Sequence, residues 1–290
     1  MPGFTTPTRR ALACLAALWL LGACAFDQNG PTSAVTGDAL DSLEAPPLAR
    51  TLRLADAARG GGDLASAVRL YRQAIRQRPE ALRPYIELGD TLHAQRNYHQ
   101  AIDAFDAAAK RARVDEDTAG EADARTGRGR ALLGLHRPAE ALEPLAAALE
   151  LAPRHRVARN ARAVALDALG RHEAAQEIYR SLLARNDADA IAQGNLGLSL
   201  AISGGHAEAI RILDDLVMQA GSGARARQNL AIAYALSGDY DAAREVMRAD
   251  LGERAVEDNV AYLDTVRFLL KARDAGTRNR ARRALGDRPE

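Results

Sequence analysis

Cysteine is almost missing from this sequence of 290 residues. Its only two cysteines, Cys14 and Cys24, lie within the first 24 residues. Residues 25–290 therefore contain no disulfide and no cysteine-ligated metal site. Their fold has to be held together by packing alone.

Aromatic residues and net charge are also scarce. Only 4% of the residues are aromatic, whereas Ala, Leu and Arg dominate. These three residue types cost least in a helix, so the composition predicts an all-α fold. A hydrophobic content of 47% excludes a wholly disordered chain. The net charge of +1 gives the whole chain no field that would recruit nucleic acid, and we expect no such partner.

No hydrophobic run is long enough for an ordinary membrane span. Arg9 and Arg10 precede sixteen uncharged residues, from Ala11 to Phe26, and a span needs about 20. A basic start, an apolar stretch and small residues at its end are typical of a secretory signal. An ordinary signal cleaved elsewhere, or an uncleaved anchor, are the alternatives.

The end of this run resembles the bacterial lipobox. Leu21, Gly22 and Ala23 precede Cys24, and the lipobox has a leucine and two small residues before its cysteine. The resemblance implies that residues 1–23 are a lipoprotein signal peptide and that Cys24 carries a diacylglyceryl thioether and further palmitate-like chains. Several acyl chains give stable attachment. Ala25, in place of Asp, favours the periplasmic face of the outer membrane by analogy with enterobacterial lipoproteins.

The next segment is polar and shows no helical periodicity. Residues 24–47 combine the modified cysteine with a stretch that contains Gly, Pro, Ser and Thr. Such a composition is typical of a flexible tether. We therefore expect the remainder of the chain to work close to a membrane.

A repeat fills most of the remaining chain. Similar phrases place an alanine at intervals of 34, 40, 34, 34 and 34 residues, at Ala67, Ala101, Ala141, Ala175, Ala209 and Ala243. A period of 34 is that of the tetratricopeptide repeat, a helix pair that buries its faces by stacking on its neighbours. The sequence predicts an all-α, right-handed superhelical solenoid of about six pairs over residues 48–255.

Two segments depart from this period. The interval of 40 hides six extra residues around Lys110 to Asp123, for which we favour a longer second helix over a charged loop. After the last repeat, apolar residues at helical spacing predict a capping helix over residues 256–275. The basic tail, residues 276–290, is predicted to be disordered.

Catalytic motifs are incomplete. His172 and Glu173 begin a zinc-protease pattern, but Gln176 stands where the second histidine belongs. Gly127 and Gly129 lack the third glycine of a dinucleotide loop and fall inside a repeat helix. We therefore expect no catalytic residue, no metal, no cofactor and no small-molecule substrate, and predict that the chain is not an enzyme.

The first helices of such repeats line a groove. Its N-terminal half is predicted to be charged, with Arg83, Asp90, Asp123 and Arg130 among its residues, and its C-terminal half to be apolar. We predict a protein-binding groove at Asn160, Val164, Asn195, Leu198, Ile202, Asn229, Ile232 and Leu236. The two asparagines of repeats five and six would reach the backbone of a bound segment, and the apolar stripe would dock a helix or an extended segment of a partner. Alternatively, the capping helix fills the stripe.

The last third of the chain resembles the TadD family of repeat lipoproteins, which belong to tight-adherence (Flp) pilus systems. The resemblance rests on the repeat containing Gln228-Asn-Leu-Ala231, followed by an acidic stretch and by Asn259-Val-Ala-Tyr-Leu263. It implies an accessory factor in pilus biogenesis that binds a secretin or another pilus assembly component. A type IV pilus pilotin and an adaptor for peptidoglycan-remodelling enzymes are the alternatives.

The lipobox resemblance predicts the effect of changing Cys24→Ala. Without the thiol there is no thioether, so the chain should move from the membrane fraction to the soluble fraction of cell envelopes. Fractionation followed by immunoblotting, with Cys14→Ala as the matched control, measures this. An unchanged membrane location of the Cys24→Ala chain would contradict the lipobox interpretation.

Overall fold

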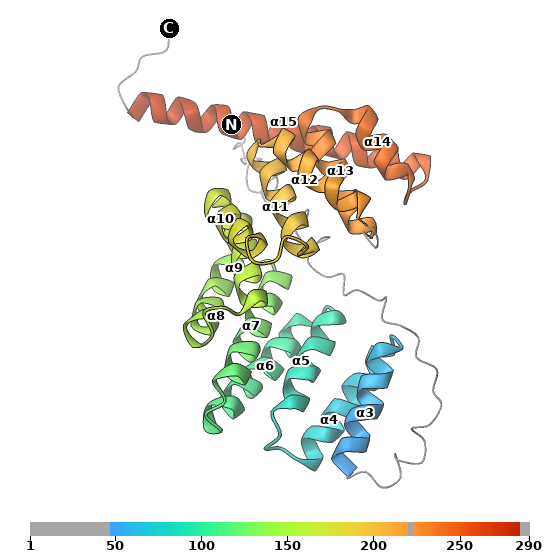
Figure 1. Cartoon of the computed structure of the whole chain (residues 1–290), viewed down its shortest axis with the longest axis vertical. Coiled ribbons are helices and arrows are strands. Elements are labelled where there is room, and N and C mark those ends of the chain that lie inside the picture. Colours follow the sequence, from blue (N-terminus) through green and yellow to red (C-terminus); the bar gives the residue numbers. More distant parts are fainter. Residues whose placement is uncertain (1–46, 220–222, 285–290) are drawn as a thin grey trace, which may run out of the picture. The chain divides into compact units, whose positions relative to one another are not determined.

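The described chain, residues 47–219 and 223–284 of a computed structural model, consists of 13 α-helices and contains no strand (Figure 1). The predicted all-α fold is confirmed. Cys24, the signal peptide and all but the last residue of the predicted tether lie outside these residues. Among them, no helix is long and apolar enough to cross a membrane.

The described residues form two compact units, which divide after Leu169. The first unit contains α3 (Pro47–Gly60), α4 (Leu64–Gln77), α5 (Arg83–Ala94), α6 (Tyr98–Val114), α7 (Thr118–Gly134), α8 (Pro138–Leu151) and α9 (Arg156–Ala168). The second contains α10 (His172–Leu183), α11 (Ala190–Ser203), α12 (His206–Met218), α13 (Ala224–Ser237), α14 (Tyr240–Arg248) and α15 (Glu253–Ala284). The division falls between α9 and α10, the two helices of the fourth repeat.

One alanine of each repeat lies where two helices are in contact. We call these six residues, which set the period of the sequence, the marker alanines. The six alanines lie on the second helices α4, α6, α8, α10, α12 and α14, and all six are fully buried. Alanine adds the smallest side chain that still favours a helix, so the neighbouring helix can approach closely. Within each unit, consecutive helices then pack side by side.

Glycines on the first helices complete this close packing. The ring of Phe105 on α6 is buried between Gly89 of α5 and Gly127 of α7. A Cβ atom added at Gly89 would lie 2.6 Å from Phe105 Cε1, closer than carbon atoms can approach. These glycines are needed for the space beside the ring.

The six extra residues lengthen two helices, α6 and α7. The sequence predicted this for α6, the second helix of its repeat. α6 and α7 have 17 residues each, against 12 to 14 in α3, α4, α5 and α8. The turn between them places Glu116 at a φ of 55°. Asp117 then caps α7 by accepting a hydrogen bond from the Gly120 N–H at 2.9 Å. The insertion therefore extends the stack locally and leaves its register intact.

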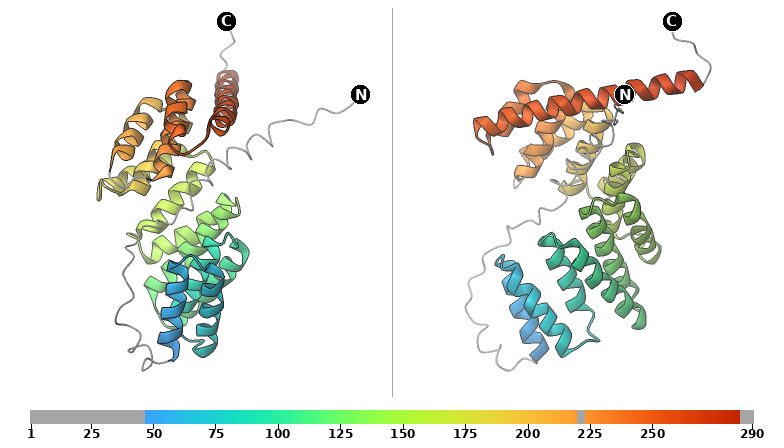
Figure 2. Two further views of the ribbon diagram at one scale, coloured as in Figure 1. Left: turned by 90° about the vertical axis from the view of Figure 1, so that its right-hand side faces the viewer. Right: turned by 180° about the vertical axis from the view of Figure 1, so that it is seen from behind.

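The C-terminal helix is longer than predicted. α15 runs from Glu253 to Ala284, 32 residues, where the sequence predicted residues 256–275 and a disordered tail. It lies beside α13 and α14 (Figure 2) and packs against both. Its buried residues are Val256, Val260, Leu263, Val266 and Leu270. The first proline after Glu253 is Pro289, so no strong stop signal interrupts the helix. Residues 285–290 lie outside the described part.

The substitution Gly89→Ala should destabilise the protein. The added methyl group overlaps the Phe105 ring, and such overpacking costs about 1–3 kcal/mol of unfolding free energy, against about 1 kcal/mol gained in helix propensity. Gly60→Ala is the control, because nothing lies within 4 Å of a Cβ at the end of α3. Urea unfolding measures both, and equal stabilities for the two variants would contradict the packing argument.

Candidate partner-binding surfaces

The predicted apolar stripe is buried in the structure. Leu198 and Ile202 lie on α11, and Ile232 and Leu236 lie on α13. Their exposed fractions are only 2–7%. The expectation of an exposed apolar wall is therefore wrong for these four side chains, which belong to the core of the second unit. An aspartate at Leu198 or Ile232 would bury a charge and destabilise the fold, so such variants cannot report on docking.

The asparagines beside the stripe are also buried. Asn229 on α13 donates a hydrogen bond from Nδ2 to the carbonyl oxygen of Gly194 on α11, at 3.2 Å. This amide group thus links two helices, whereas the sequence suggested that it binds a partner's backbone. Asn195 on α11 is buried as well.

The remaining two predicted residues belong to the other unit. Asn160 and Val164 lie on α9 and are half-buried. The eight predicted residues are therefore divided between the two units, two in the first and six in the second. Only Asn160 and Val164 retain a partly accessible side chain.

The predicted charged half of the groove is a row of ion pairs between successive first helices. We call it the first-helix row, and it joins α3 to α5, α5 to α7 and α7 to α9. Its ion pairs are Asp56–Arg83 at 2.6 Å, Arg59–Glu87 and Asp90–Arg130 at 3.2 Å. A hydrogen bond of 2.7 Å between Asp123 and the His155 ring continues the row. The structure thus brings together the charged residues that the sequence predicted in repeats two and three.

Sequence reasoning missed four members of the row, namely Asp56, Arg59, Glu87 and His155. The signal for Asp56 was present, because it precedes Ala67 by the same eleven residues that separate Asp90 from Ala101. The row also includes the Tyr71 hydroxyl, which donates a hydrogen bond to Asp56 at 2.6 Å. Burial raises the pKa of Tyr71, and its hydrogen bond to Asp56 adds to the shift.

These ion pairs contribute little to stability. Most of their side chains are partly exposed, and such pairs are worth about 0–1 kcal/mol each. Burial raises the pKa of Asp90 despite the attraction of Arg130. The first-helix row therefore defines a pattern of charges on a surface. Replacing one of its ion pairs by a contact with another chain costs little free energy.

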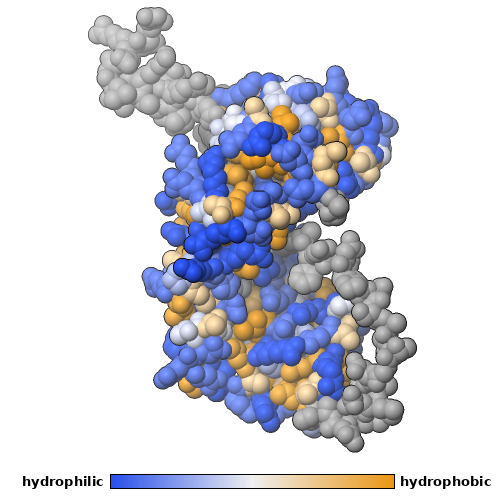
Figure 3. Space-filling view, viewed as in Figure 1, coloured by the Kyte–Doolittle hydropathy of each residue, from blue (hydrophilic) through white to orange (hydrophobic). Residues whose placement is uncertain are grey.

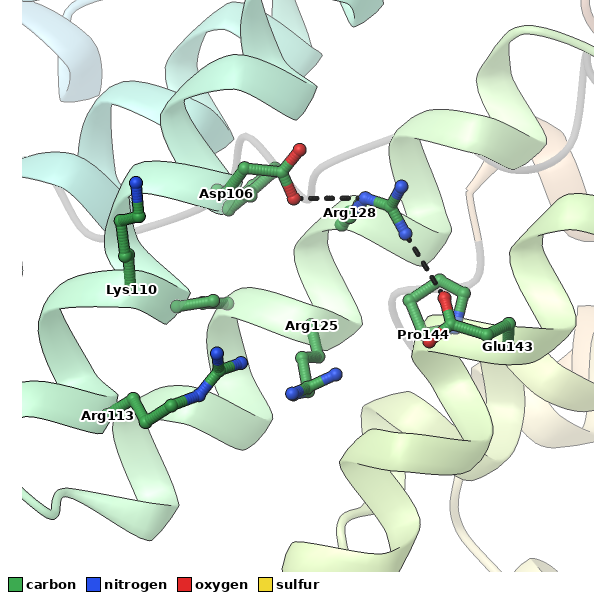
Figure 4. Close-up of a pocket in the computed structure, with 10 residues that line it drawn as sticks. Asp106, Lys110, Arg113, Arg125, Arg128, Glu143 and Pro144 are labelled. Atoms are coloured by element: carbon green, nitrogen blue, oxygen red, sulfur yellow. Dashed lines mark hydrogen bonds and ion pairs between the residues drawn. The ribbon is translucent and has the colours of Figure 1, made fainter.

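A second charged surface surrounds a cavity of about 210 Å³ between α6, α7 and α8 (Figure 4). Its floor contains Phe105, Ala109, Ala124 and Pro144. The charged residues at its edge are Asp106, Lys110, Arg113, Arg125, Arg128 and Glu143. We call it the α6–α8 pocket. Lys110 and Arg113 belong to the last turns of α6, which the insertion lengthens.

Two ion-pair groups hold the arginines of this pocket. Arg113 and Arg125 both donate to Glu121 Oε1, at 2.9 and 2.6 Å. Burial disfavours the charged form of Glu121, but the hydrogen bonds from Arg125 and Arg113 outweigh it and lower its pKa. Arg128 lies between Asp106 at 3.0 Å and Glu143 at 3.3 Å. Burial raises the pKa of Asp106, against the attraction of Arg128.

On the face of the molecule that Figure 3 shows, hydrophilic residues predominate and hydrophobic ones show between them. Among the described residues, no group of three or more His, Cys, Asp or Glu side chains is arranged to hold a metal ion. The surfaces that remain for recognition are therefore described by their charges.

His93, on α5 beside the row, should make stability depend on pH. Burial and repulsion by Arg130 lower its pKa to about 4, against 6.5 in the unfolded chain. Between these values the unfolded state binds the proton and the folded state does not, so stability is lost as the pH falls. We expect a loss of about 2 kcal/mol from pH 7 to pH 5, which His93→Gln abolishes. Urea unfolding at both pH values tests this, and equal pH dependence of the two chains would contradict it.

Comparisons with known proteins agree with the repeat architecture. Three models of the tetratricopeptide repeat match residues 51–81, residues 80–154, and residues 126–191, 160–224 and 196–256. Together they span residues 51–256. No curated protein sequence matches the chain.

Solved structures show the same fold at low sequence identity. A thermophilic repeat protein of Thermus thermophilus matches with a TM-score of 0.55 and 19% identity, over 64% of this chain and 98% of that protein. PilW, a widely conserved type IV pilus biogenesis factor, matches with a TM-score of 0.59 and 18% identity, over 71% of this chain and 94% of PilW. The Cut9–Hcn1 hetero-tetramer of the APC/C matches with a TM-score of 0.66 and 14% identity, over 88% of this chain and 48% of the matched chain. The family models over residues 51–256 show that the chain belongs to the tetratricopeptide repeat family.

Proposed function

We propose that this chain is a non-catalytic, lipid-anchored scaffold that binds protein partners at the periplasmic face of the outer membrane during pilus biogenesis. The observation that carries the proposal is the conjunction of the lipobox sequence Leu21 to Cys24 with a tetratricopeptide repeat body. Repeat stacks present extended surfaces and are typically used to bind other proteins. An acylated cysteine would keep such a surface close to the membrane.

The finer part of the proposal is a role in the tight-adherence pilus, with a secretin or another assembly component as partner. It is supported by the C-terminal resemblance, Gln228 to Ala231 followed by Asn259 to Leu263. Leu230 and Ala231 on α13 and Leu263 on α15 are buried, and these two helices pack on one another. These motif residues therefore support the C-terminal cap, and they are not themselves proposed as contacts with a partner.

The partner-binding surface is proposed on the first unit. The first-helix row presents acids and bases from α3, α5, α7 and α9, with the half-buried Asn160 and Val164 on the last of these helices. Exposed ion pairs of this kind exchange partners at small cost in free energy. A partner segment that carries both signs of charge fits this surface better than an apolar helix.

A second candidate function is that of a type IV pilus pilotin or assembly factor. The likeness in fold to PilW, which is described as a type IV pilus biogenesis factor, favours it. Both candidates share the anchor, the repeat body and a pilus partner. They differ in the identity of the pilus machinery that the chain serves.

Affinity capture of the acylated chain from envelopes, followed by mass spectrometry, tests the proposal. We expect a secretin and pilus assembly proteins, with lower recovery for Cys24→Ala because that chain is no longer held at the membrane. Arg130→Glu should also lower recovery, since it removes a cation of the first-helix row, whereas the matched control Arg211→Glu on α12 should not.

Two other results would change the conclusion. Recovery of cell-wall hydrolases without a secretin would contradict the pilus proposal and favour the adaptor alternative. Recovery of type IV pilus proteins without tight-adherence proteins would contradict the finer assignment and leave the second candidate.

A further inference from the structure

The α6–α8 pocket lies beside the one interruption in the repeat. Four of the five intervals between marker alanines are 34 residues, and the interval of 40 falls between Ala101 and Ala141. The extra residues lengthen α6 to Val114 and place Arg113 beside the cavity. Lys110 stands nine residues after Ala101, in the same register as Arg76 after Ala67 on α4. Neighbouring repeats stack without such an extension, so stacking alone does not require it.

Cations outnumber carboxylates around the cavity. Its edge carries four cations, Lys110, Arg113, Arg125 and Arg128, and two carboxylates, Asp106 and Glu143. Arg113 and Arg125 share one carboxylate oxygen of Glu121, which is itself buried. Lys110 is exposed and forms no ion pair within the described part of the chain. The pocket therefore has donors to offer to a further acidic group.

The shape of the cavity suits a peptide segment. Its volume of about 210 Å³ exceeds that of a single carboxylate, and of the small apolar residues in its floor Ala109 is partly exposed, whereas Ala124 and Pro144 are buried. Phe105, the aromatic residue of the floor, is 1% exposed and offers no face on which a nucleic-acid base could stack. Carboxylates on a short chain would meet the guanidinium groups at the edge, while its apolar atoms cover the floor.

We infer that the α6–α8 pocket binds an acidic peptide segment of a protein partner, with Lys110, Arg113 and Arg125 contacting its carboxylates. This inference rests on the proposed scaffold function and adds the chemistry of one contact. Arg128 on α7 pairs with Asp106 on α6 and with Glu143 on α8, so both of its neighbours in the pocket are already carboxylates.

The scarcity of lysine allows a sharp test. Although the chain has 39 Lys and Arg residues, Lys110 and Lys271 are the only two lysines. A short acetylated and amidated peptide with several glutamates, of which one is activated as a succinimidyl ester and the others remain carboxylates, can acylate these two side-chain amines with release of N-hydroxysuccinimide. We expect peptide mapping to find the adduct on Lys110 in preference to Lys271. Equal modification of the two lysines would overturn the inference.

Binding of the unactivated, fluorescently labelled peptide is measured by anisotropy at low salt. Lys110→Glu and Arg113→Glu should each weaken binding about tenfold, the effect of losing one charge-assisted contact of about 1.4 kcal/mol. Lys110→Arg should keep binding and lose the adduct. The charge-matched control is Arg76→Glu, an exposed position on α4 outside the pocket.

The outcomes separate this inference from the proposed function. Absence of binding, equal weakening by all three glutamate variants, or equal binding of the glutamine version of the peptide would overturn the pocket assignment. Lys110→Glu changes an exposed side chain without an ion pair, so its result stands even if Arg113→Glu disturbs folding. The measurement uses purified protein and needs neither anchor nor pilus proteins, and envelope capture can therefore fail while peptide binding succeeds.

Discussion

The contact on which the rest of the structure depends is the close approach of helices at one alanine per repeat. Six alanines on six second helices are fully buried, and no disulfide or metal site reinforces the described stack. In repeat proteins, stability is close to a sum over repeats and their interfaces. A side chain larger than alanine at any of these positions would separate two helices and weaken that sum. The shared geometry of this one contact therefore keeps the surface of the stack in register.

Because the core depends on small side chains, the surface can vary without loss of the fold. The insertion after Ala101 shows this, since α6 and α7 become longer while Ala141 remains buried in the next repeat. Charged residues on the first helices likewise pair across repeats at little energetic cost. The proposed function uses this freedom. A fixed stack presents one row of charges on its first helices and one cationic pocket where the period is interrupted.

The sequence was sufficient for the features that depend on spacing alone. The interval of 34 residues identified the helix pairs, and the offset of eleven residues from each alanine places Asp56, Asp90 and Arg130 on the same row. The end of α15 was missed because the chain carries no strong stop signal before Pro289. The α6–α8 pocket was missed because its lining comes from three helices, and spacing along the sequence does not show which side chains of α6, α7 and α8 lie around one cavity.

The predicted apolar groove failed for a different reason. Counting along a helix gives the direction in which Leu198 or Ile232 points, but it does not say what packs over that side chain. In the structure α11 and α13 approach closely enough for Asn229 to bond Gly194, and the apolar side chains beside them are buried. The same counting succeeded for charged residues. Charged side chains remain at the surface, so they lie on the side of the helix that the counting predicts.

The functional account depends most on the lipid anchor at Cys24, since the repeat body by itself gives no indication that the protein works at the cell envelope. The most direct measurement is the mass of the N-terminal peptide of the mature chain isolated from bacterial envelopes. The account predicts a peptide that begins at Cys24 and carries a diacylglyceryl group on its sulfur. A peptide that begins at any other residue, or an unmodified Cys24, would contradict it.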